Sequence, residues 1–246
     1  HSKGFYVLAY REGEYGGHRT AIVRNLIAFN DDRCPGISAG TVVCANNYVH
    51  ACGRAASIHI DDHAGARKGY IKASIVANVL GGGSAPIALR SGENPQSKFY
   101  LGPDNIRDGQ LITEPWNSPH ITQQHPWPKP APVPAHKHAG SPQEAIWIPG
   151  YQVIPPEQVK DHVLAHAGAR PADRDPVDRR IINNIETGNG KVIASQEEVG
   201  GWPALADNHR ALTVPHDPWG DADGDGYTNL EQWLHAFAAQ VEGAEH

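Results

Sequence analysis

The sequence predicts an all-β fold, in which short parallel strands coil into a solenoid that is followed by a proline-rich arm and a small α-helical tail. Asparagine precedes an apolar residue at Asn25, Asn47 and Asn78, and each of these corners follows a run of β-forming residues. The first interval, 22 residues, is the length of one solenoid turn. The alternative is a chance recurrence in a chain rich in glycine and asparagine.

The corner asparagines predict a hydrogen-bonded ladder inside the coil. Asparagine tolerates left-handed backbone angles, and its amide can donate to one neighbouring turn while it accepts from the other. The second interval is longer, 31 residues, because the polar stretch 61–69 is typical of a loop inserted between two strands. Such a loop on a β-coil is a candidate binding face.

Residues 1–113 are the predicted coiled domain, in which short β runs alternate with glycine and asparagine corners. The runs have few polar interruptions, as expected for parallel strands that are buried on both faces. They cover residues 5–9, 21–24, 41–44, 57–60, 71–77, 87–89 and 98–101.

Residues 114–156 are the predicted arm. They contain eleven prolines, which predicts an extended segment without regular secondary structure. Because Trp116, Trp127, Trp147 and Ile148 are interleaved with the prolines, we expect the arm to pack along the flank of the coil.

Residues 157–246 are the predicted helical extension. A helix over 157–167 would end at Gly168, and a second would begin at Asp175-Pro176 and end at Thr187. A third helix, over 228–241, has Thr228 and Glu231 at capping-box spacing.

Composition argues against several classes of function. Apolar residues make up 39% of the 246 residues without a run of eighteen, so no membrane span is expected. Residues 1–110 carry a net charge of +3 and residues 111–246 a net charge of −9. The β-rich part is therefore suited to an anionic ligand, but its charge is too small and dispersed for nucleic acid.

The sulfur-containing residues give two further indications. Cys34, Cys44 and Cys52 lack CxxC spacing, so neither zinc nor haem attachment is indicated. One disulfide with a free thiol, or three buried thiols, would both fit. Methionine is absent, which indicates a processed chain or part of one.

An Asp/Gly loop precedes the third predicted helix. Asp221, Asp223 and Asp225 alternate along a segment that matches the first seven positions of an EF-hand loop, in which Tyr227 offers its backbone carbonyl. Gln232 stands where the bidentate Glu is expected, and Glu231 lies one residue earlier. We expect a shortened Ca²⁺ site over 221–231 with Glu231 as the last ligand and a structural role. The alternative is a turn in which Glu231 only caps the helix.

A series of short motifs follows in order along most of the chain. They are His1-Ser2-Lys3-Gly4, Arg24-Asn25-Leu26, Ala28-Phe29-Asn30, Arg33-Cys34-Pro35, Ala45-Asn46-Asn47-Tyr48, residues 86–101, Asp175-Pro176-Val177-Asp178, residues 198–203 and the Asp/Gly loop. Their order resembles the second half of a pectate lyase of the right-handed parallel β-helix superfamily, with the C-terminal extension of many bacterial members. The resemblance therefore implies a right-handed parallel β-helix.

The resemblance also implies Ca²⁺-assisted β-elimination on an acidic polysaccharide such as polygalacturonate, by a secreted enzyme. In the family an arginine of an Arg-x-Pro-x-x-Arg motif removes the C5 proton, and Arg33 with Pro35 matches its first half. Lys3 lies near the place of the family's substrate-binding lysine, and Arg11 is a further substrate-binding candidate. His59 and His63, which flank the acidic pair in the inserted loop, are candidates for substrate contact or for a surface role.

The chain departs from the family pattern in two respects. Ser38 replaces the second motif arginine, and the family's calcium-binding carboxylates lie upstream of His1. A second chain or an N-terminal fragment could cover the first turn, because unpaired strand edges recruit partners. The alternative function is a non-catalytic structural or carbohydrate-binding β-helix, such as a self-assembling subunit or processed fragment, with Arg33 as a structural residue paired with Asp31 or Asp32.

Overall fold

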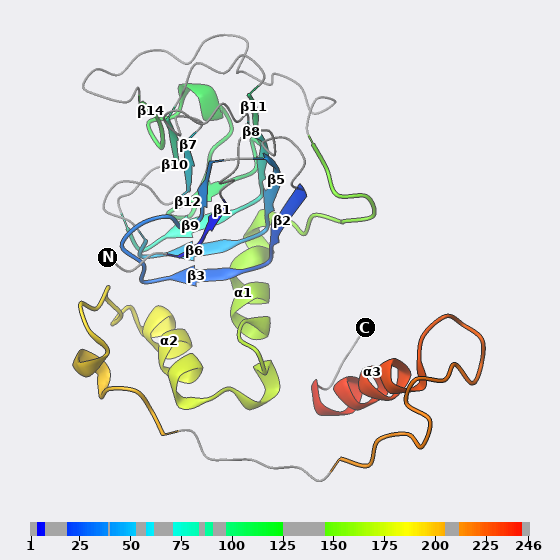
Figure 1. Ribbon diagram of the computed structural model, residues 1–246. Coiled ribbons are helices and arrows are strands. Elements are labelled where there is room, and N and C mark those ends of the chain that lie inside the picture. The colour runs from blue at the N-terminus through cyan, green and yellow to red at the C-terminus, as the bar shows by residue number, and fades with distance from the viewer. Residues whose placement is uncertain are drawn as a thin grey trace.

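The computed structural model describes residues 4–7, 19–38, 40–52, 58–61, 71–83, 87–90, 97–124, 146–204 and 212–242. In these ranges the β-strands form three sheets, and successive passes of the chain add one strand to each sheet in turn (Figure 1). Strands of successive passes pair in parallel. The predicted β-rich, parallel character of this region is confirmed.

The strands are distributed over the sheets as follows. The first sheet has the order β1 (Tyr6–Val7), β4 (Gly36–Ile37), β7 (His59–Asp61), β10 (Ile87–Arg90) and β14 (Ile121–Gln124). The second has the order β2 (Arg19–Val23), β5 (Gly40–Ala45), β8 (Ile71–Val76) and β11 (Lys98–Leu101). The third contains β3 (Leu26–Ala28), β6 (Tyr48–His50), β9 (Val79–Gly81), β12 (Ile106–Arg107) and β13 (Gln110–Leu111), and β13 is antiparallel to β12.

The core lies between the three sheets. Because side chains alternate along a strand, Val42 and Cys44 of β5 point into this core while Val43 and Ala45 belong to a separate outer cluster. Phe99 of β11 is the largest of the fully buried side chains. Burial on both faces explains why these strands show apolar runs instead of clean alternation.

The predicted asparagine ladder is present and has one more member. The side-chain amides of Asn25, Asn47 and Asn78 each donate to the Oδ1 of the next ladder residue, over 3.0, 2.9 and 3.1 Å. The fourth member, Asn105, ends the ladder because its amide donates to the carbonyls of Ile75 and Gly102. The backbone N–H groups of the first three asparagines donate to the same Oδ1 acceptors.

The left-handed backbone angles lie beside the ladder residues and not at them, which corrects the prediction. Arg24, Asn46 and Ala77 directly precede ladder asparagines and have φ of 56°, 56° and 50°. The chain therefore turns one residue earlier, and this leaves each asparagine side chain directed along the stack.

Helices and the end of the arm cover the outer faces of two sheets. α1 (Pro156–His166) and α2 (Pro176–Thr187) pack against the third sheet through Val159, Val163 and Ile182, which cluster with Tyr48. Ile146, Ile148 and Tyr151 of the arm pack against the outer side chains of β5 and β8. Asn46 binds the arm to the coil, because its Oδ1 accepts hydrogen bonds from the Tyr151 hydroxyl and the Ile154 N–H over 2.9 and 3.1 Å.

The helix boundaries follow the predicted signals. α1 is followed by Ala167 and a left-handed Gly168, and Asp175 caps α2 by accepting from the backbone of Val177 and Asp178. α3 (Asn229–Glu242) begins after the Thr228–Glu231 capping box. Short 3₁₀ turns are η1 (Pro115–Asn117), η4 (Pro171–Asp173) and η5 (Gln196–Val199).

Two expectations need correction. The chain is not all-β, because α1, α2 and α3 are substantial elements. Residues 114–156 are not free of regular structure either, because β14 adds a strand to the first sheet beside β10 and η1 precedes it. Trp116 packs against the core as expected, whereas Trp127 lies outside the described residues. The three domain boundaries stay predictions.

The helices in the described ranges include none that is long and apolar enough to cross a membrane.

Candidate functional site

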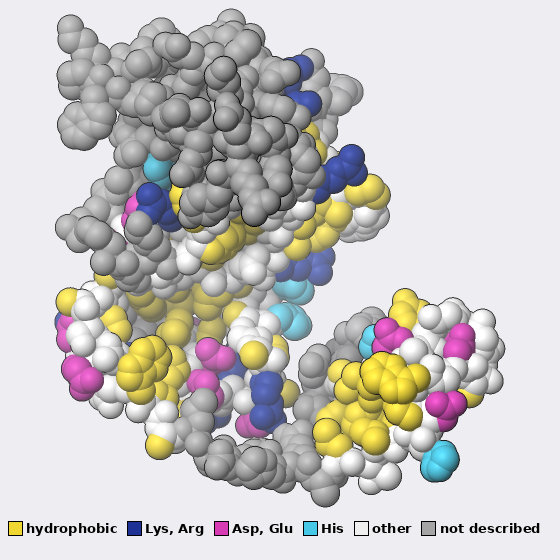
Figure 2. All heavy atoms as spheres, viewed as in Figure 1, with side chains coloured by type: hydrophobic (Ala, Val, Ile, Leu, Met, Phe, Trp, Pro, Cys, Tyr) yellow, Lys and Arg dark blue, Asp and Glu magenta, His cyan; other side chains and the backbone are white. Residues whose placement is uncertain are grey.

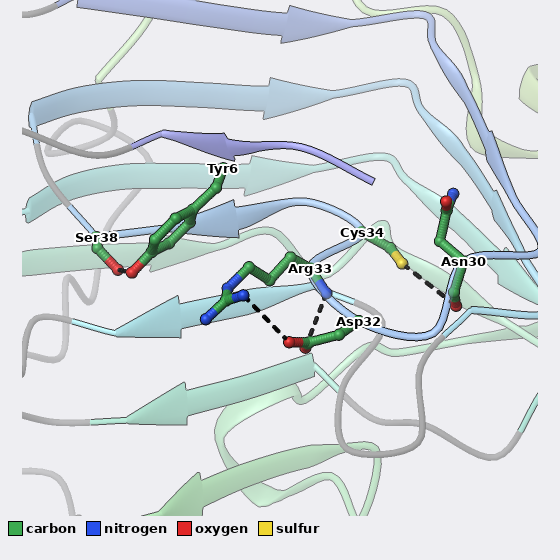
Figure 3. A network of polar contacts seen from close by, with 6 residues as sticks. All are labelled: Tyr6, Asn30, Asp32, Arg33, Cys34 and Ser38. Atoms are coloured by element: carbon green, nitrogen blue, oxygen red, sulfur yellow. Dashed lines mark hydrogen bonds and ion pairs between the residues drawn. The ribbon is translucent and has the colours of Figure 1, made fainter. Parts of the chain in front are cut away.

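Arg33 lies in the bend between β3 and β4, next to the first strand of the first sheet (Figure 3). The segment is held by backbone hydrogen bonds, since Phe5 N–H donates to the Arg33 carbonyl and Gly4 N–H to the Asp32 carbonyl, each over 3.1 Å. Arg33 has a left-handed φ of 56°. The Arg33 side chain lies against Gly36 of β4 and under the Tyr6 ring (Figure 3).

The Arg33 guanidinium has two partners. Its Nη1 lies 3.6 Å from Asp32 Oδ2, and its Cζ lies 4.7 Å from the centre of the Tyr6 ring. The Arg33 backbone N–H also donates to Asp32 Oδ1 over 2.8 Å. The side chain keeps 25% of its surface exposed, while Nε is buried without a hydrogen-bond partner. The result is an oriented cation that can still bind an external anion.

Tyr6 connects Ser38 to this cation, because Tyr6 contacts both residues. Its hydroxyl is hydrogen-bonded to the Tyr6 hydroxyl, and the residue is 4% exposed. Position 38, where the resembled family has its second arginine, is therefore close to Arg33 in space. Serine supplies no charge there, so a carboxylate at this place meets one arginine among the residues described.

Of the other predicted substrate-binding residues, the structure describes His59 alone. Lys3, Arg11 and His63 lie outside the described residues. His59 is on β7 and not in the inserted loop, and its N–H donates to the Pro35 carbonyl over 2.9 Å. At 6% exposure, the His59 side chain offers little surface to a polymer.

Sequence reasoning missed Tyr6. Its contact with Ser38 spans 32 residues, and the two meet because β1 and β4 are paired strands. An aromatic residue in a short β run gives no local sign of such a partner. Asp32, one of the two predicted partners of Arg33, forms an ion pair with it.

The Asp/Gly loop brings its three aspartates together. One carboxylate oxygen from each of Asp221, Asp223 and Asp225 lies within 4.8 Å of the others. Asp221 accepts from the N–H groups of Gly224 and Gly226, over 2.7 and 3.0 Å. Both glycines have left-handed φ, which lets the loop curl around the carboxylates. Acidic side chains are exposed on this part of the surface (Figure 2).

The expected last ligand does not join the cluster. Glu231 Oε2 accepts from the backbone N–H and hydroxyl of Thr228, both over 2.7 Å, and these hydrogen bonds lower the pKa of Glu231. Gln232 Nε2 instead donates to Asp223 Oδ2 and Asp225 Oδ2, over 2.7 and 3.2 Å. Its hydrogen bond lowers the pKa of Asp223. Glu231 thus takes the position that the capping alternative predicted.

The loop fits calcium in part. Three converging carboxylates and the Tyr227 carbonyl are hard oxygen donors of the kind that Ca²⁺ prefers. The bidentate carboxylate that closes such a site is missing, so the donor set suits weak binding.

A cavity of about 410 Å³ lies between β3 and the helices, lined by segments that include Leu26, Asn30, Asp178 and Ile182. Its lining combines apolar side chains with the polar Asn25 and Asn30, and its charged member is Asp178. A polyuronate would be repelled there, so this cavity is a poorer candidate for an anionic ligand than the surface around Arg33.

Comparison with protein-family models, with curated proteins and with solved structures finds no match for this chain.

Proposed function

We propose that this chain is a right-handed parallel β-helix of a secreted pectate lyase-like protein that acts on an acidic polysaccharide. The sheet order supports the fold, because each pass of the chain supplies one strand to each of three sheets. Right-handed crossovers between parallel strands are strongly favoured. Secretion follows from the size of the substrate, a polymer that meets the protein outside the cell.

One observation supports the lyase function above the others: Arg33 is a positioned, partly exposed cation on the first sheet. In the proposal a uronate lies across this sheet, and Arg33 in its neutral form, after it has released its own proton to solvent, removes the C5 proton. When bound between protein and substrate carboxylates, Ca²⁺ makes that proton more acidic. The net charge of +3 on residues 1–110 favours approach of a polyanion.

The alternative, a non-catalytic carbohydrate-binding β-helix, has its own supporting observation. Arg33 forms an ion pair with Asp32, and an arginine side chain keeps its proton in almost any setting, which suits anion binding better than proton removal. Ser38 adds no second cation. Both functions place an acidic polysaccharide at Arg33. They differ in whether unsaturated uronides are released from it.

We also propose that a second chain or an N-terminal segment covers the first turn of the coil. Among the described strands, β2 and β3 are the outermost of their sheets, and no described residue donates to Asn25 Oδ1. A further turn from a second chain or an N-terminal segment would donate to this oxygen and would carry the upstream calcium carboxylates.

The decisive assay follows ultraviolet absorbance of unsaturated uronides during incubation with polygalacturonate, with Ca²⁺ and with a chelator. Lyase activity predicts an absorbance rise that the chelator removes. Affinity electrophoresis in the same polymer measures binding. Retardation without product identifies the carbohydrate-binding function, and a folded chain that neither binds nor cleaves contradicts both functions.

For the Asp/Gly loop we propose weak Ca²⁺ binding with a structural role. Terbium luminescence sensitised by Tyr227 should saturate, and Ca²⁺ should displace the terbium with a Kd of about 10⁻⁵ to 10⁻³ M. Asp223→Ala should abolish the signal, whereas Asp161→Ala, which removes an exposed carboxylate of α1, should not. Gln232→Glu restores a carboxylate at the twelfth position and should tighten binding about tenfold. If neither the wild type nor Gln232→Glu binds terbium or Ca²⁺, the calcium prediction is wrong.

A further inference from the structure

Cys34 and Cys52 belong to the same core cluster and lie in neighbouring turns of the coil. Cys34 follows Arg33 in the bend before β4, and Cys52 lies just after β6. The register pairs Ala28 of β3 with His50 of β6, which brings the continuation of β6 to Asn30. Asn30 contacts both thiols: its carbonyl is 3.9 Å from Cys34 Sγ, and its backbone hydrogen-bonds Cys52.

A side-chain hydrogen bond between the two thiols is the largest cause of the change in both pKa values, and it raises the pKa of Cys34 and lowers the pKa of Cys52. Further contacts fix each sulfur, since Cys52 Sγ donates to the Ile27 carbonyl over 3.3 Å and Gly4 packs over both Ile27 and the Cys34 backbone. Cys34 is 0% and Cys52 3% exposed, so a covalent bond between them would be shielded from reductants in solution.

Cys44 has a different environment, although it belongs to the same core. Its Sγ lies 3.3 Å from Asn47 Nδ2 and 3.7 Å from Asn78 Oδ1, so this thiol is part of the asparagine ladder. Burial raises the pKa of Cys44 to about 12, whereas the hydrogen bond from Cys34 lowers the pKa of Cys52.

We propose that Cys34 and Cys52 form an intramolecular disulfide in an oxidising environment and that Cys44 remains a thiol. The oxidant is a small disulfide such as glutathione disulfide, which acts on the folding chain before the core closes. The Cys52 thiolate attacks it and releases one glutathione thiolate. The Cys34 thiolate then attacks Cys52 Sγ and releases the second. Two cysteine thiols lose two protons and two electrons, and one glutathione disulfide becomes two glutathione thiols.

The bond would join the Arg33 bend to the turn above it in the stack. The disulfide is independent of any lyase activity. The sequence alone allows either one disulfide with a free thiol or three buried thiols, and the proposal selects the first of these. Because the disulfide links neighbouring turns, it would hold the backbone on which the Arg33 side chain is mounted.

The test is differential alkylation of the full chain after refolding with reduced and oxidised glutathione. Free thiols are blocked in denaturant, disulfides are then reduced, and the released thiols receive a second label. No lysine or arginine lies between Cys34 and Arg54, so one tryptic peptide carries all three cysteines and fragmentation places each label. We expect the first label on Cys44 and the second on Cys34 and Cys52.

Thermal unfolding provides the second measurement. Wild type refolded in reductant should have a Tm about 5–10 °C lower than wild type refolded under oxidising conditions, since the disulfide closes a short loop. Cys44→Ser should keep this shift, and Cys52→Ser should lose it. Three free thiols in the refolded wild type, or a disulfide that includes Cys44, would overturn the proposal. If a variant fails to fold, the positions of the two labels in the wild type still test the proposal.

Discussion

Arg33→Ala is expected to abolish uronide release, with kcat lower by about 10³-fold and the fold intact. Removing the guanidinium deletes the group that the lyase proposal assigns to proton removal, while Asp32 and Tyr6 stay in place. Initial rates by ultraviolet absorbance and binding by affinity electrophoresis together separate kcat from affinity.

Arg24→Ala is a closely matched control for this variant. Arg24 has the same φ of 56° as Arg33, and its Cζ also lies over a tyrosine, 5.3 Å from the centre of the Tyr151 ring. Both substitutions therefore place alanine in a left-handed backbone and remove one cation–π contact. Equal loss of activity in the two variants would contradict the catalytic assignment, and weaker binding without any activity in wild type would identify a binding role for Arg33.

Asn47→Ala is expected to lower the free energy of unfolding by about 3 kcal/mol. Asn47 is fully buried, its amide donates to the Ile22 carbonyl and to Asn78, and its Oδ1 accepts from Asn25. The truncation leaves a buried carbonyl unpaired and a small cavity between turns. Urea unfolding followed by circular dichroism measures the difference.

Asn25→Ala is the control for the ladder. Asn25 is exposed and lies at the end of the ladder, so water can replace what its side chain provides, and the expected loss is about 1 kcal/mol. If both variants lose the same stability, burial within the ladder is not what makes these asparagines important.

The ladder also shows how far sequence reasoning reaches. Asn25, Asn47 and Asn78 could be predicted because each precedes two apolar residues, whereas Asn105 precedes Ile106-Arg107 and escapes that pattern. Helix ends were equally predictable, since Asp175 and Thr228 act on neighbours in the chain. β14 was missed because its few residues stand among prolines, and only its pairing with β10 makes it a strand.

The candidate site was less accessible to prediction. Arg33 stood out by its motif, but Tyr6 and Ser38 join it through strand pairing across the coil. In the Asp/Gly loop, the three aspartates are close in sequence and their convergence was predictable. The choice between Glu231 and Gln232 depended on which side chain the helix cap would take, and spacing alone does not decide that.

The direction of the ladder also matters for how the protein is made. Each asparagine amide donates to an asparagine that lies later in the chain, from Asn25 toward Asn105. On a ribosome, where residues emerge from the N-terminal side, a corner amide has no asparagine acceptor until another turn has been synthesised. Asn105 finds its carbonyl acceptors in its own turn and the previous one. The ladder is therefore completed in the order of translation, and each corner amide waits one turn for its asparagine acceptor.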